Sequence, residues 1–155
     1  MNSKKIKTIL FLVLAGLFTF SSCSSNDDNN PPINPIHIQV KNNVQQSTWR
    51  ITKFIDSGED ETNHFTGYNF TFGINGTLTA SNESNTFNGT WSITDSNSND
   101  DSQNDLEFNI NFNLTNDFED LNDDWDFVSQ SSSKIELIDI SGGNGGTDNL
   151  TFEKN

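Results

Sequence analysis

Residues 106–114 read LEFNINFNL, and the alternation in this stretch decides the fold class. Its apolar positions fall on every second residue: Leu106, Phe108, Ile110, Phe112 and Leu114. Successive side chains of a β-strand point to opposite faces, so a period of two is expected where one face meets a core and the other meets water. The stretch therefore predicts a half-buried strand.

Seven further segments between residues 44 and 154 combine Phe, Trp, Ile and Thr and are separated by Asn, Gly, Asp or Ser, which predicts strands joined by turns. They are residues 47–55, 67–72, 77–80, 87–93, 125–129, 134–140 and 150–153. The pair Asn75-Gly76 tolerates positive φ and predicts a tight hairpin between two of them. Residues 117–121 predict a single helical turn before the strand at Trp125.

Short connections leave no room for the helical crossover that parallel pairing needs. We therefore predict an all-β fold for residues 44–155, a small up-and-down antiparallel β-barrel of about eight strands. Closing such a sheet removes its aggregation-prone edges. The many Phe and Trp residues predict an interior filled by the protein's own side chains, with binding left to the open rim and loops.

The N-terminus has the layout of an export signal. MNSKKIK carries three lysines and no acid, and the 13 residues TILFLVLAGLFTF that follow are almost all apolar. An apolar run of this length is shorter than the roughly 20 residues that a membrane-spanning helix requires. Residues 1–22 are therefore predicted to be a signal peptide.

Cys23 is the only cysteine in the chain. The run Phe20-Ser21-Ser22-Cys23 resembles the lipobox of bacterial lipoproteins, with Phe where leucine is usual. The resemblance implies diacylglyceryl transfer to the Cys23 thiol and cleavage after Ser22. A buried thiol is the alternative, but the polar neighbours SSCSSNDDNN would lose their hydration in a core. We predict lipidation at Cys23 and attachment of the protein to a membrane through this anchor.

Residues 23–43 contain all three prolines and read as a disordered, acidic tether. His37 lies in this segment and is expected to be inert. Residues 24–28, SSNDD, resemble the serine-and-acid export signal of Bacteroidota surface lipoproteins. We expect a lipid-anchored protein of the outer membrane on the cell surface, with the periplasmic face as the alternative.

The charge of the chain excludes one class of partner. Its 8 Lys and Arg against 22 Asp and Glu give a net charge of −14, which becomes −17 if the signal peptide leaves with its three lysines. Such a field repels phosphate backbones, so we expect no nucleic-acid partner. With one cysteine, no disulfide can form within the chain.

Catalytic patterns are missing from the sequence. His64 is the only histidine in residues 44–155, with no obvious oriented acid beside it, and there is no G-x-S-x-G, HExxH, CxxC or phosphate-binding glycine loop. We predict no catalytic residue, no cofactor and no enzyme activity. Five acidic residues could still include the pair of carboxylates that a glycoside hydrolase needs, although solvated surface acids are the simpler interpretation. These acids are Glu119, Asp120, Asp123, Asp124 and Asp126.

The loop from Asp95 to Asp101 has oxygen-bearing side chains at alternate positions, as calcium loops do. It differs from a calcium loop at two places: Asp100 stands where the sharp turn needs glycine, and the twelfth residue is Leu106 rather than glutamate. We therefore predict a polar hairpin tip and no metal site.

The order of aromatic motifs along residues 44–155 resembles the lipocalin-like lipoproteins of Bacteroidota. The motifs are Trp49, Tyr68 to Phe72 followed by Asn75-Gly76-Thr77, Gly89-Thr90-Trp91, Trp125 and Leu150-Thr151-Phe152. The resemblance implies a barrel of about eight strands. The chain has Ser47-Thr48-Trp49 where true lipocalins carry Gly-x-Trp, a departure that argues against a lipocalin-type pocket.

Three functions follow as hypotheses. The first is a non-enzymatic binding or surface-presentation role. A more specific version of it is that the barrel binds a small apolar ligand. The second is a surface glycan-binding module or weak glycan hydrolase. The third is a purely structural or adhesive envelope protein.

Overall fold

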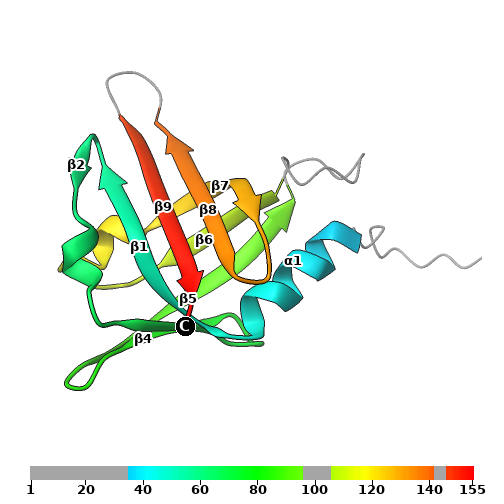
Figure 1. Cartoon of the computed structure of the whole chain (residues 1–155), viewed down its shortest axis with the longest axis horizontal. Helices are drawn as coiled ribbons and strands as arrows, with labels where there is room; N and C mark the ends of the chain where they lie inside the picture. The colour runs from blue at the N-terminus through cyan, green and yellow to red at the C-terminus, as the bar shows by residue number, and fades with distance from the viewer. Residues whose placement is uncertain (1–34, 96–105, 142–145) are drawn as a thin grey trace, which may run out of the picture.

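A computed structural model describes residues 35–95, 106–141 and 146–155 (Figure 1). Its elements are α1 (Pro35–Gln45), β1 (Thr48–Asp56), β2 (Glu59–Asp60), η1 (Thr62–Phe65), β3 (Asn69–Phe72), β4 (Thr77–Ser81), β5 (Thr86–Asp95), β6 (Leu106–Asn111), η3 (Glu119–Leu121), β7 (Asp123–Gln130), β8 (Lys134–Ile140) and β9 (Thr147–Lys154). The eight predicted strands are all present, and so is the predicted helical turn, as the 3₁₀ turn η3.

The strands form a closed antiparallel barrel. From β3 to β9 each strand pairs with the next, and β1 pairs with both β3 and β9. Eight strands close the barrel, as predicted, while β2 extends from β1 as a short hairpin. The turn of this hairpin has positive φ at Ser57 (49°) and Gly58 (92°), which matches a two-residue type I′ turn. Sequence reasoning missed β2 because a two-residue strand has no periodicity.

The Asn75-Gly76 hairpin is confirmed, with a different turn from the one that the pair suggested. Only Gly76 has positive φ (81°), and the loop begins at Gly73, whose N–H donates to the Thr77 carbonyl at 2.7 Å. The Asn75 side chain instead accepts a hydrogen bond from the Thr77 hydroxyl at 2.8 Å. The asparagine therefore stabilises the turn through its amide oxygen.

Aromatic rings fill the interior, as their number predicted. The largest fully buried side chains include both Trp49 and Trp125. Phe72 contacts Trp91, Phe108 and Phe152 edge-to-face, with ring centroids 5.3–5.5 Å apart. Such geometry contributes about 0.5–1.5 kcal/mol per pair beyond the burial of apolar area. The middle of the barrel is a packed core.

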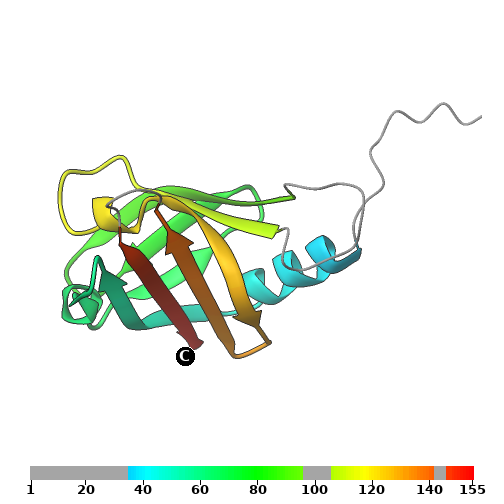
Figure 2. The same cartoon turned by 90° about the horizontal axis from the view of Figure 1, so that it is seen from above.

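Helix α1 closes one end of the barrel (Figure 2). Val40 and Val44 are buried in the core, and Ile36 packs against it, so the apolar residues recur every four positions. His37 contacts the Ile93 carbonyl through Nε2 at 3.0 Å. The expectation of a disordered tether is therefore wrong for residues 35–43, where His37 also has a hydrogen-bond partner, and α1 starts at Pro35, a residue suited to the first helical position. Residues 23–34 lie outside the described part of the chain.

Within the described ranges, no helix has both the length and the apolar character needed to cross a membrane.

Candidate functional site

The end of the barrel opposite α1 is closed by two 3₁₀ turns, η1 and η3 (Figure 1). Phe65 of η1 and Phe118 next to η3 are both buried, and their rings meet edge-to-face at 5.4 Å. Phe65 also contacts Phe54 of β1 at 5.4 Å, and Phe118 contacts Phe112 at 5.0 Å. We refer to Phe65 and Phe118 as the aromatic plug.

Local hydrogen bonds fix η1 against β1. Strand β1 pairs with β3 only through Thr48 and Trp49, and η1 covers the wall beyond that point. The Thr62 hydroxyl accepts from the Phe54 N–H at 2.8 Å and lies 3.3 Å from the Phe54 carbonyl. The Glu61 N–H donates to the same carbonyl at 3.0 Å. These bonds replace the strand partner that Phe54 lacks on this side.

Asn122 holds η3 in a similar way. Its side-chain amide donates to the Phe112 carbonyl at 3.0 Å and its side-chain oxygen accepts from the Phe112 N–H. The Asn116 oxygen accepts from the Phe118 N–H at 3.2 Å, which sets the start of the turn. Sequence reasoning did not single out Asn122, because an asparagine among many asparagines carries no pattern of its own.

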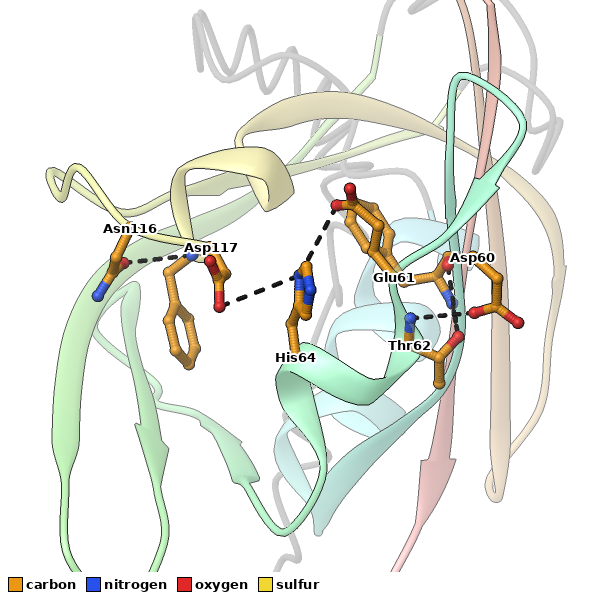
Figure 3. A network of polar contacts seen from close by, with 8 residues as sticks. Asp60, Glu61, Thr62, His64, Asn116 and Asp117 are labelled. Atoms are coloured by element: carbon orange, nitrogen blue, oxygen red, sulfur yellow. Dashed lines mark hydrogen bonds and ion pairs between the residues drawn. The ribbon is translucent and has the colours of Figure 1, made fainter.

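His64 is part of η1, and its ring lies between the carboxylates of Glu61 and Asp117 (Figure 3). Its Nδ1 atom is 3.9 Å from Glu61 Oε2 and 4.0 Å from Asp117 Oδ2. Both separations are too long for hydrogen bonds and correspond to charge contacts when the imidazole is protonated. The sequence analysis found no oriented acid beside His64, and the structure corrects that interpretation: Glu61 approaches the histidine from three residues earlier in the chain, and the fold brings Asp117 to it from the η3 segment.

The carboxylates around His64 disfavour one another's ionisation. Burial raises the pKa of Glu61, and the nearby charge of Asp56 raises it further. Burial also raises the pKa of Asp120, with Asp56 and Asp117 adding to the effect, whereas His64 lowers both values. Glu61 Oε2 is a buried atom with no hydrogen-bond partner among the described residues. We call Asp56, Glu61, His64, Asp117 and Asp120 the rim.

A second acidic group lies at the start of β7. Burial raises the pKa of Asp123 to about 6, and the charges of Asp139 and Asp124 contribute in the same direction. Asp139 stands opposite Asp148 in the β8–β9 register. Asp148 in turn accepts a hydrogen bond from the Ser57 N–H at 2.6 Å.

The five acids considered for a glycosidase pair are divided by the fold. Glu119 and Asp120 belong to η3, and the charge of Glu119 contributes to the raised pKa of Asp120. Asp123 begins β7, where its Oδ1 accepts from the Asp124 N–H at 2.8 Å. Asp124 and Asp126 are exposed and alternate with the buried Trp125 and Phe127. The five therefore lie on two different elements, η3 and β7.

Two shallow hollows lie near these groups. One, of about 470 Å³, is beside η1 and is lined by Asp60, Thr62, Asn63 and Thr66. The other, of about 400 Å³, lies over β6 and the start of β7 and is lined by Asn109, Ile110, Asn111, Asn122, Asp123 and Asp124. Both are open to solvent and are lined mostly by residues with polar side chains, which can form hydrogen bonds to a ligand.

Several predicted sites are not tested by the described residues. Cys23 lies outside them, as does the calcium-like loop apart from Asp95. In residues 35–95, 106–141 and 146–155, no three His, Cys, Asp or Glu side chains are grouped so that they could hold a metal ion.

Comparisons with known proteins identify a structural likeness but no family. No protein-family model matches the chain, and no curated protein matches it. Among solved structures, the crystal structure of a DUF4847 family protein from Bacteroides vulgatus ATCC 8482 is 22% identical, covers 75% of this chain and 97% of its own, and has a TM-score of 0.49. This likeness assigns neither a family nor an activity to the chain.

Proposed function

We propose that the protein is a non-enzymatic, lipid-anchored envelope protein whose lipocalin-like barrel binds or presents a partner on its outer surface. One observation carries the second half of this proposal: the core is packed and both of its ends are covered. Val40 and Val44 cover one end, and the aromatic plug covers the other. An eight-stranded barrel has little more room than its own side chains need.

The anchor and the fold together suggest an orientation. α1 is the described element nearest to Cys23 in the chain, so an anchor at Cys23 would hold the α1 end toward the bilayer and the rim away from it. Charged pairs near the α1 end include Arg50 with Glu153 at 3.1 Å and Lys134 with Glu136 at 2.5 Å. Each of these pairs is neutral overall, so they repel an anionic membrane surface less than the carboxylates of the rim do. The distribution of charge supports an acidic rim that faces outward.

A glycan-binding role is the second candidate, and one surface favours it. The exposed faces of β3, β4 and β5 carry hydroxyl and amide side chains without a single charged residue: Asn69, Thr71, Thr77, Thr79, Ser81, Thr86, Asn88, Thr90, Ser92 and Thr94. The residues are aligned across the strands, with Thr71 opposite Thr79 and Thr79 opposite Asn88. In a chain of net charge −14, such a neutral face suits an uncharged polysaccharide.

Lipid anchoring is tested by labelling growing cells with an alkyne fatty acid and comparing the parent with Cys23→Ala. The label should appear in the parent and disappear in the variant, while Ser24→Ala, beside the cysteine, keeps it. Protease treatment of intact cells then distinguishes the outer surface from the periplasmic face. Label retained on Cys23→Ala would contradict the anchor.

Surface binding is tested by titrating the full chain with a fatty acid and with a neutral polysaccharide while following tryptophan fluorescence. A paired Thr79→Asp and Asn88→Asp variant places charge on the neutral face and should abolish binding of the polysaccharide. Asn149→Asp on β9 is the matched control. Binding of the fatty acid alone would instead support an apolar ligand within the barrel.

A further inference from the structure

Two turns from distant parts of the sequence meet over the core at the rim. η1 follows the β1–β2 hairpin, and η3 precedes β7. They meet through the aromatic plug beneath and through His64 above, which lies within 4.0 Å of a carboxylate on each side. His64 therefore provides the charged contact between the turns.

His64 contacts Glu61 from its own turn and Asp117 from the η3 segment. The other charges that act on Glu61 and Asp120 are also negative, and they come from Asp56 of β1 and from Asp117 and Glu119 of the η3 segment. When the imidazole is neutral, these carboxylates repel one another across the two turns. When it is protonated, its positive charge lies between Glu61 and Asp117 and attracts both. Protonation of this one group therefore changes the contact between the turns from repulsive to attractive.

We propose that His64 is a pH-sensitive latch that holds η1 and η3 together over the aromatic plug when its imidazole is protonated and loosens them when it is neutral. Histidine is the side chain that ordinarily changes charge between about pH 5 and 8. The raised pKa values of Glu61 and Asp120 act in the same direction, because their ionisation with rising pH adds repulsion at the rim.

Opening the latch would expose rings that are already close to solvent. Tyr68 and Phe87 are half-buried, and their ring centroids lie 5.1 and 4.7 Å from that of Phe118. Displacement of Phe118 would join these rings to the core as an apolar surface. The latch therefore controls access to the aromatic interior, independently of any ligand on the outer faces.

Trp125 contacts η3 directly, so its fluorescence is sensitive to movement of this turn. The indole N–H of Trp125 donates to the Leu121 carbonyl in η3 at 3.1 Å. Loosening of η3 breaks this bond and changes the surroundings of a tryptophan that is otherwise buried. The amides of Leu121 and Asn122, which bond to carbonyls within the same turn, report the same event by hydrogen exchange.

The test measures protection of the Leu121 and Asn122 amides in the full chain between pH 6 and 8, corrected for intrinsic exchange. In the parent, protection should fall about fivefold as pH rises, since an exposed ion pair has a modest effect. His64→Gln should show low protection throughout, and His64→Lys, which keeps a positive charge, high protection throughout. Glu61→Gln should reduce the pH dependence.

His37→Gln, at the opposite end of the barrel, is the matched control and should behave as the parent does. The fluorescence emission of Trp125 should rank the variants in the same order as the amide protection does. Equal pH dependence in the parent and His64→Gln would overturn the latch, and so would a parent whose protection does not change with pH.

Discussion

Trp49 donates its indole hydrogen to the Val44 carbonyl at 2.8 Å, and both residues are fully buried. The bond joins the first strand to the last turn of α1, so the helix that closes the barrel is fixed by a polar contact inside the core. Trp125 repeats the arrangement with the Leu121 carbonyl, and Trp91 with the Gly73 carbonyl at 2.9 Å. Each tryptophan therefore ties one non-strand segment to the barrel.

Trp49→Phe should lower the free energy of unfolding by about 1–3 kcal/mol, because the Val44 carbonyl would stay buried without its donor. Urea denaturation followed by circular dichroism measures the change. Trp91→Phe is the comparison, since its bond is only partly buried and the Gly73 carbonyl also accepts from Gln45 Nε2 at 3.4 Å. A smaller loss for Trp49 than for Trp91 would contradict this account.

Val44→Ala should cost about 2 kcal/mol of stability, as expected when buried methyl groups are deleted from a packed core. Ile38→Ala, on the exposed side of the same helix, should change stability by less than about 0.5 kcal/mol. Both variants are compared by urea denaturation. Equal effects at the two positions would show that α1 does not belong to the folded core.

Gly89→Ala should destabilise the barrel by about 1–3 kcal/mol through overpacking. A Cβ atom at this position would stand 2.4 Å from the Asn111 carbonyl oxygen and 2.8 Å from Phe112 Cδ1. Gly67→Ala tests backbone strain alone, because its φ is +84° and no atom lies within 4 Å of the added Cβ. If the loss at Gly89 does not exceed that at Gly67, the steric explanation fails.

Asp123→Asn should stabilise the protein at neutral pH. The pKa of Asp123 in the folded chain, about 6, lies above the ordinary carboxyl value, so stability is lost as pH rises through that range. The variant should exceed the parent by about 1 kcal/mol at pH 7.5, after allowance for solvent screening, and match it near pH 3.5.

Thermal unfolding of Asp123→Asn across this pH range gives the comparison. Asp126→Asn, on the exposed face of the same strand, is the control and should differ from the parent by less than about 0.5 kcal/mol. A stabilisation of Asp123→Asn that is independent of pH would rule out ionisation as its cause.

Much of the fold is predictable because strand burial is a local property. The alternation of LEFNINFNL locates β6, and similar segments locate the other long strands. The missed elements have physical reasons: β2 is too short for a period, and the apolar spacing of Ile36, Val40 and Val44 was obscured by the surrounding prolines and asparagines.

The site was less predictable than the fold. His64 was identified as the only histidine of the domain, but its carboxylate neighbours were not, because Asp117 reaches it only through the closed barrel. Asp123 was one of five acids that looked alike in the sequence. Its environment, rather than its neighbours in the chain, sets its pKa.

The sequence by itself determined the strands, the turns between them, the filled aromatic interior and the acidic surface, since each depends on residues close together in the chain. Only the tertiary structure decided that α1 closes one end, that two 3₁₀ turns close the other, and that His64 lies between Glu61 and Asp117. Those contacts depend on barrel closure through β1 and β9, and no local pattern of side chains specifies which distant residues a closed sheet brings together.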